Sequence, residues 1–247
     1  MPFFPYFDPM YLLIVAPGIV LGLWASFKVR SAFARYSRVA TTSGMSGAEV
    51  AAALLSRSGV PGVRIERTHG GTLSDHYDPR SRVLRLSPEV FSGRSVASAA
   101  VAAHEAGHAL QDAGGYAPLA LRTAAVPVAS LGSKLSWVLI LLGMTLGYFT
   151  KNPAYLEWIP VLLWGGVVGF AAVVAFQLVT LPVELNASAR ARGRLVELGL
   201  VAREEEDGVK AVLDAAALTY VAAAVTGLLT LLYYLARLGL LGGRQHR

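Results

Sequence analysis

The stretch IPVLLWGGVVGFAAVVAFQLVTLP, from Ile159 to Pro182, contains no charged residue. An α-helix rises about 1.5 Å per residue, so about 20 apolar residues cross the hydrocarbon layer of a bilayer. The stretch is therefore predicted to be a transmembrane helix rather than a buried helix of a soluble protein. Three further segments are long and apolar enough for the same prediction: Met10–Phe27, Ala124–Phe149 and Ala215–Leu235.

The composition of the whole chain agrees with a membrane protein. Of its 247 residues, 54% are hydrophobic and 15% are charged, and the mean hydropathy is +0.50. Soluble domains have about 25% charged residues. These values exclude a disordered chain, a disulfide-rich mini-protein and an ordinary soluble enzyme. The chain has no cysteine, which excludes disulfides, thiolate metal ligands and cysteine nucleophiles.

The distribution of basic residues predicts the orientation of the chain, because cytoplasmic loops carry an excess of Lys and Arg. Residues 28–123 hold 12 of the 22 basic residues and residues 183–214 hold five, whereas the loop 150–158 holds one. We predict that the first two segments are cytoplasmic and that the short loop and both termini are external. Three arginines after residue 235 argue against an external tail. No basic residue precedes the first apolar segment, so it is predicted to be an uncleaved anchor rather than a signal peptide.

These predictions divide the chain into five parts and give a mainly α, four-helix integral membrane protein with a small α+β portion. The parts are an N-terminal anchor with a basic segment (1–39), a cytoplasmic portion (40–123), two transmembrane helices (124–182), a cytoplasmic helix (183–214), and a last transmembrane helix with its tail (215–247).

The cytoplasmic portion shows the patterns of a small α+β unit. Ser46 and Glu49 form a capping box, which predicts a helix start at this point. Three short extended runs follow, and then a long helix that ends at two glycines. The runs and the helix are predicted at Val63–Arg67, Leu73–Tyr77, Arg82–Leu86 and Arg94–Ala113.

This predicted long helix contains the sequence His104-Glu-Ala-Gly-His108, and its other residues are mostly small or apolar. Residues four apart share one face of a helix, so both imidazoles can point at one metal ion. Glu105 lies about 100° round the helix, where its carboxylate can touch a water molecule on that metal. Zinc lowers the pKa of such a water toward neutrality, and the carboxylate then takes its proton. The spacing therefore predicts a hydrolytic zinc centre.

A catalytic zinc site needs a third protein ligand. Glu184 is the better candidate, because two membrane crossings after His108 return the chain to the same side of the bilayer. Alanine and serine residues three, four and seven positions after it would let its helix approach closely. His69 or His76 is the rival third ligand, whereas His246 lies in the C-terminal tail.

Four motifs resemble a known family, the YugP-type membrane zinc metallopeptidases of bacteria. They are HEAGHALQ at 104–111, LSDHYDP at 73–79, FQLVTLPVE at 176–184 and AAALTYV at 215–221. The resemblance extends from about residue 10 to 235. This family is in turn similar to the membrane heat-shock zinc endopeptidases and the CAAX prenyl proteases, which are gluzincins.

The resemblance implies a zincin-like cytoplasmic portion with one zinc ion per chain. It implies His104, His108 and Glu184 as the ligands and Glu105 as the general base. Family members commonly carry aspartate where this chain has Asn186. An aspartate there could accept a proton from a ligating histidine and raise its basicity. Asparagine carries no charge, so we expect this support to be weaker here.

The resemblance also implies a role for the extended run Leu73–Tyr77. In gluzincins, an edge strand beside the metal-binding helix pairs with an extended substrate, which gives affinity with few sequence demands. His76 or Tyr77 could donate a hydrogen bond to the oxyanion of the reaction. The alternative is that both side chains only support the strand.

We therefore predict a membrane-embedded zinc endopeptidase of the bacterial inner membrane, with its active site on the cytoplasmic side. Its partners would be the lipid bilayer and a protein or peptide substrate that is itself membrane-associated. The alternative is a non-catalytic membrane scaffold or adaptor with a structural zinc. Three protein ligands plus water favour the enzyme, and a fourth protein ligand such as His76 favours the scaffold. Basic residues are not interleaved with aromatic ones, so nucleic-acid binding is not expected.

Overall fold

The computed structural model of the chain describes residues 8–68, 70–71, 74–150 and 152–239. Over these residues the fold is mainly α-helical with one small sheet, as predicted. The chain forms two compact units. One comprises the described residues of Met1–Leu23, Leu121–Thr180 and Val221–Arg247, and the other comprises Trp24–Ala120 and Leu181–Tyr220.

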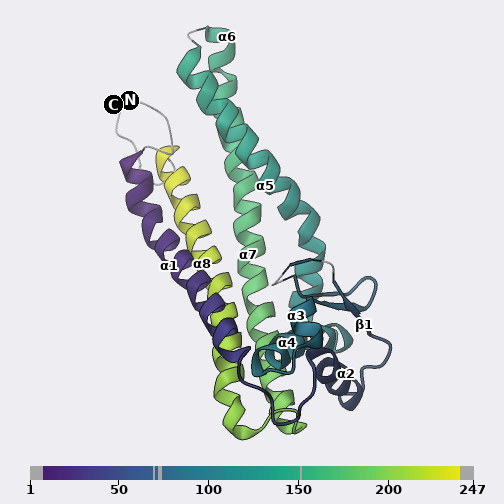
Figure 1. Cartoon of the computed structure of the whole chain (residues 1–247). Coiled ribbons are helices and arrows are strands. Elements are labelled where there is room, and N and C mark those ends of the chain that lie inside the picture. The colour runs from purple at the N-terminus through teal and green to yellow at the C-terminus, as the bar shows by residue number, and fades with distance from the viewer. Residues whose placement is uncertain (1–7, 69, 72–73, 151, 240–247) are drawn as a thin grey trace. The chain divides into compact units, whose positions relative to one another are not determined.

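Long apolar helices make up the first unit (Figure 1). In the described part of the chain, four helices are long and apolar enough to cross a membrane, and they contain the four predicted transmembrane segments. A short helix, α6, precedes the third of them. The elements are α1 (Pro9–Tyr36), α5 (Ala117–Phe149), α6 (Pro153–Leu156), α7 (Trp158–Glu197) and α8 (Glu206–Arg237).

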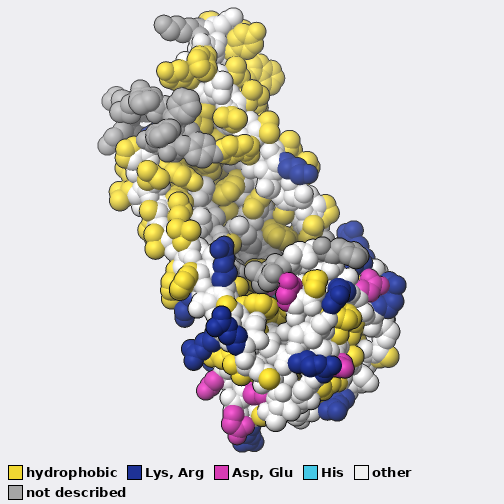
Figure 2. All heavy atoms as spheres, in the orientation of Figure 1, with side chains coloured by type: hydrophobic (Ala, Val, Ile, Leu, Met, Phe, Trp, Pro, Cys, Tyr) yellow, Lys and Arg dark blue, Asp and Glu magenta, His cyan; other side chains and the backbone are white. Residues whose placement is uncertain are grey.

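Large apolar side chains remain exposed along these helices. Leu13 is 73% exposed, Leu23 69% and Val168 66%. Figure 2 shows many hydrophobic side chains on the visible face of this unit and few charged ones. Contiguous apolar surface of this kind suits contact with lipid rather than water. Within the unit, a Cβ atom added to Gly132 would lie 2.6 Å from the Gly169 carbonyl oxygen, so glycine allows α5 and α7 to approach closely.

The second unit contains the predicted α+β portion. Its sheet, among the described residues, has the strand order β1-β3-β2, with β1 parallel and β2 antiparallel to β3. Residues of α7 and α8 that follow Leu181 complete the unit. Its other elements are α2 (Gly47–Arg57), β1 (Arg64–Arg67), β2 (His76–Asp78), β3 (Val83–Leu86), α3 (Pro88–Ser92) and α4 (Val96–Ala113).

A hydrophobic core fixes α4 within this unit. Leu54 of α2, Leu84 of β3 and Leu195 of α7 are fully buried in that core, together with many alanines of α4. The predicted capping box is confirmed, since the Ser46 and Glu49 side chains each accept a hydrogen bond from the other residue's backbone N–H. The helix that carries the histidines is packed on nearly all sides, since 15 of its 18 residues are buried.

Element boundaries differ slightly from the predictions. Helix α4 begins at Val96 instead of residue 94, because Ser95 is extended and its side chain caps the N–H of Ser98. The second strand begins at His76, and Leu73 lies outside the described residues. Helix α7 continues through Pro182, so the third apolar segment and Glu184 share one helix.

Candidate metal centre

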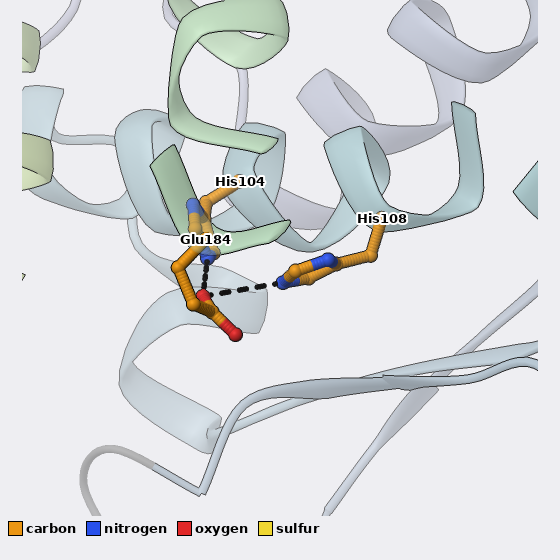
Figure 3. Close-up of side chains that lie close together, drawn as sticks. All are labelled: His104, His108 and Glu184. Atoms are coloured by element: carbon orange, nitrogen blue, oxygen red, sulfur yellow. Dashed lines mark hydrogen bonds and ion pairs between the residues drawn. The ribbon is translucent and has the colours of Figure 1, made fainter. Parts of the chain in front are cut away.

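Three buried side chains of the second unit converge on one point (Figure 3). His104 is 9% exposed, His108 6% and Glu184 1%. The Oε2 atom of Glu184 lies 3.1 Å from Nε2 of His104 and 3.5 Å from Nε2 of His108. One ligand atom from each residue lies within 4.8 Å of the others. Two imidazole nitrogens and a carboxylate oxygen at this separation are a donor set that suits a divalent cation.

Local sequence explains why these groups meet. The two histidines are four residues apart on α4 and so share a face. Glu184 approaches from α7, where Ala187 and Ala191 are fully buried. A Cβ atom added to Gly107 would lie 2.6 Å from the Ala187 carbonyl oxygen, so the two helices almost touch beside the centre. The small residues after Glu184 therefore permit the close approach that the sequence predicted.

The outer nitrogens of both imidazoles are also hydrogen-bonded. Nδ1 of His108 lies 3.0 Å from Oε1 of Gln111, and Nδ1 of His104 lies 3.1 Å from Oγ of Ser188. An amide oxygen can only accept, so Nδ1 of His108 carries a proton toward Gln111, and Nε2 is the nitrogen that faces Glu184. Metal-ligating histidines characteristically use one nitrogen for the metal and the other for such a partner.

The charge of Glu184 suits a metal ligand. Burial raises the pKa of its carboxyl group, but hydrogen bonds and charge interactions with His104 and His108 outweigh burial, and they lower the pKa below its ordinary value. The group is therefore ionised at neutral pH. Deprotonated carboxylate is the form that binds a cation.

Comparison with known proteins agrees with this donor set. The sequence from residue 11 to 239 matches the family described as "Putative neutral zinc metallopeptidase". The chain belongs to this zinc metallopeptidase family. It is also 44% identical, over 225 residues, to the "Putative membrane protease YugP" of Bacillus subtilis (strain 168). That alignment covers 91% of this chain and 95% of the relative. No solved structure matches the chain significantly.

The sequence also predicts two further residues for this site, Glu105 and Asn186. Glu105 directly follows the first histidine on α4 and is buried, with 8% of its surface exposed. Asn186 follows Glu184 by two residues on α7, and its Oδ1 accepts hydrogen bonds from Nε2 of Gln111 (3.0 Å) and Nε of Arg190 (2.7 Å). Asn186 thus reaches His108 through Gln111, whereas the sequence suggested a direct contact with a histidine.

Gln111 was not singled out from the sequence. It is fully buried and lies three residues after His108, on the same face of α4. A glutamine at this position in an apolar helix could have marked Gln111 as part of the site, because a buried amide group needs hydrogen-bond partners.

The predicted substrate-binding residues lie on the strand β2. His76 is exposed, its Nδ1 lies 2.9 Å from the Ser74 carbonyl oxygen, and it does not join the cluster of described ligand residues. The Tyr77 hydroxyl donates a 2.8 Å hydrogen bond to Asp112, and burial and this carboxylate raise the pKa of Tyr77 to about 12. The other candidate ligands, His69 and His246, lie outside the described residues.

Proposed function

We propose that this chain is a membrane-embedded zinc endopeptidase in which His104, His108 and Glu184 hold one zinc ion and Glu105 is the general base. The observation that carries the proposal is the convergence of two imidazoles and a carboxylate at one buried point on α4 and α7. Membership of a zinc metallopeptidase family supports the choice of zinc, although the same donors also suit manganese or cobalt.

Three protein ligands leave one position of a tetrahedral zinc site open, as catalytic sites do. A structural zinc would need a fourth protein ligand. Among the described residues, the cluster of possible ligands contains three members, and His76 is engaged elsewhere. This arrangement supports the enzyme over the scaffold.

Zinc held at this point would lower the pKa of the attacking water and polarise the carbonyl group of the substrate. Glu105 would accept a proton from that water and later deliver it to the nitrogen of the leaving amine. The Glu105 carboxylate is suited to this work because it follows the first ligand, His104, on α4 without being one of the three ligands. Two products result, one with a new carboxyl group and one with a new amino group.

An extended peptide is the substrate form that this unit suits. β2 is an outer strand of the sheet and packs against α4, the helix that carries both histidines. A peptide could pair with the backbone of β2 and so lie across the centre with few demands on its side chains. His76 remains a candidate oxyanion donor on this strand, whereas the hydroxyl proton of Tyr77 is already given to Asp112.

The substrate would be membrane-associated, because α7, the helix that carries Glu184, includes an apolar segment long enough to cross a bilayer. The surplus of Lys and Arg in residues 28–123 and 183–214 supports a centre on the cytoplasmic side of the bacterial inner membrane.

The variant Glu105→Gln tests this proposal. We expect the purified full-length variant to retain zinc, measured by elemental analysis, and to cleave casein or a fluorogenic peptide at least about 100-fold more slowly, since general bases contribute 10²–10⁴-fold. Ser98→Ala is the matched control, because Ser98 is also buried on α4 but bonds to Glu89 outside the centre. Unchanged cleavage by Glu105→Gln would refute its role as the base.

A further inference from the structure

We propose that Gln111 is a positioning residue for this centre, because one side-chain amide both orients His108 and holds the turn of α7 that carries Glu184. The proposal rests on the zinc site proposed above and adds to it a residue that sets the geometry of two ligands at once. Gln111 makes no contact with the reacting groups in this role and acts only through its neighbours.

The hydrogen bonds of Gln111 use both ends of its amide group. Oε1 accepts from Nδ1 of His108 at 3.0 Å. Nε2 donates to the Val183 carbonyl oxygen at 2.8 Å and to Oδ1 of Asn186 at 3.0 Å. The side chain is 0% exposed, so no bulk water competes for these partners. A buried, fully paired amide of this kind has one favourable orientation.

That orientation dictates the tautomer of His108. Because the amide nitrogen faces two acceptors on α7, the amide oxygen must face the imidazole, and it can only accept a proton. Nδ1 therefore carries a proton, and Nε2, which faces Glu184, is the nitrogen left to bind a metal. The other tautomer would place two lone pairs against each other, so Gln111 prepares His108 to bind a metal before any metal arrives.

The same amide also holds the Glu184 turn. Val183 and Asn186 flank Glu184 on α7, and Gln111 bonds to both from α4. Asn186 is held from its other side by Nε of Arg190, whose guanidinium group lies 5.8 Å from the ring centre of Tyr116. A chain of contacts thus runs from Tyr116 through Arg190, Asn186 and Gln111 to His108.

His104 lacks an equivalent support. Its Nδ1 partner is the Ser188 hydroxyl, which can either donate or accept and therefore does not dictate a tautomer. We accordingly expect the loss of Gln111 to weaken zinc binding more than the loss of the Ser188 hydroxyl.

Zinc affinity and histidine tautomers of the purified full-length protein in detergent test the proposal. We expect Gln111→Met to weaken zinc binding about 10- to 100-fold in competition with a chelator, and Ser188→Ala to weaken it less. Ser98→Ala, the buried control on α4, should stay within about twofold of the wild type. In the zinc-free wild type, ¹⁵N NMR of labelled histidines should show His108 protonated on Nδ1, and Gln111→Met should show a mixture of tautomers.

Gln111→Glu separates the two parts of the role, because it keeps an acceptor for His108 but loses both donors to α7. We expect one His108 tautomer and a zinc affinity between those of the wild type and Gln111→Met. A wild-type His108 that populates both tautomers without zinc would overturn the proposal even if every variant failed to fold. Unchanged zinc affinity in Gln111→Met would overturn it as well. Absence of zinc binding by the wild type would instead refute the proposed function.

Discussion

At the scale of single residues, the centre consists of polar side chains buried where an unpaired group would be costly. A buried donor or acceptor without a partner costs about 1–3 kcal/mol. Glu184 and Gln111 are 1% and 0% exposed, and hydrogen bonds pair both of them. The buried polar groups of the centre thus hydrogen-bond to one another. Replacement of one of these residues leaves the polar group of a neighbour without its partner.

Glu184→Gln isolates the charge of the third ligand from its shape. An amide has nearly the same volume but binds zinc poorly, so we expect zinc affinity to fall more than about 100-fold, beyond the usual effect of a residue that merely supports a ligand. Chelator competition on the purified protein measures this. Glu197→Gln on the same helix is the control, since Glu197 is exposed and pairs with Arg194. Equal affinities for the two variants would remove Glu184 from the ligand set.

Tyr77 predicts a pH dependence of stability. Burial and Asp112 raise its pKa to about 12 in the folded protein, whereas tyrosine in an unfolded chain has a pKa of about 10. Below pH 10 the Tyr77 hydroxyl is protonated in both the folded and the unfolded chain, so its stabilising effect on the fold is complete. Between pH 10 and 12 the unfolded chain loses this proton first, and the stabilising effect is progressively lost. The stability advantage of the wild type over Tyr77→Phe should therefore shrink between pH 10 and 12 in denaturant titrations. An advantage that stays constant over this range would contradict the assignment.

The sequence predicts some of these residues better than others. His104 and His108 follow from helical periodicity alone, because a local spacing determines which face they share. Glu184 needed an argument about membrane crossings, and its convergence with the histidines depends on tertiary packing. The place of Gln111 in an apolar helix could have marked it as important, but its partners could not be predicted, since they lie on α7 more than 70 residues away and one of them is a backbone carbonyl group.

At the scale of elements, the centre depends on how closely α4 approaches α7. Both helices were predictable from their composition, but their boundaries were less so. Helix α7 passes through Pro182, a residue that usually ends a helix in a soluble protein but is tolerated in apolar, membrane-type helices. The continuity of α7 matters, because it places the third apolar segment and Glu184 in one helix.

Gly107→Ala tests the close approach of these helices. The added Cβ atom would lie 2.6 Å from the Ala187 carbonyl oxygen, and backbone cannot yield as a flexible side chain can. We expect a loss of about 1–3 kcal/mol in stability, as for overpacking in a core, together with weaker zinc binding. Gly193→Ala is the control, because space is open at that glycine of α7 and alanine favours a helix. If Gly107→Ala leaves zinc affinity as unchanged as the control does, the geometry of the centre does not depend on the close approach of α4 and α7.

At the scale of the whole molecule, the two units have different surfaces. The helices of the first unit expose apolar side chains, whereas Lys, Arg, Asp and Glu side chains gather on the visible face of the second (Figure 2). Composition was sufficient to predict this division, since length and lack of charge mark a lipid-crossing helix. Composition alone says less about the fold of the second unit, because its short strands depend on pairing between distant segments.

Cysteine labelling tests the orientation of the whole molecule in the membrane. The chain has no cysteine, so Arg80→Cys and Glu157→Cys each introduce a single thiol at an exposed position. Arg80 belongs to the unit that carries His104, and Glu157 belongs to the other unit, beside the sparsely charged loop. Because Lys and Arg concentrate in segments that stay in the cytoplasm, a membrane-impermeant maleimide should label Glu157→Cys in intact cells and Arg80→Cys only in inverted vesicles. The opposite pattern would put the metal centre on the external side, where its substrates would be exported rather than cytoplasmic segments.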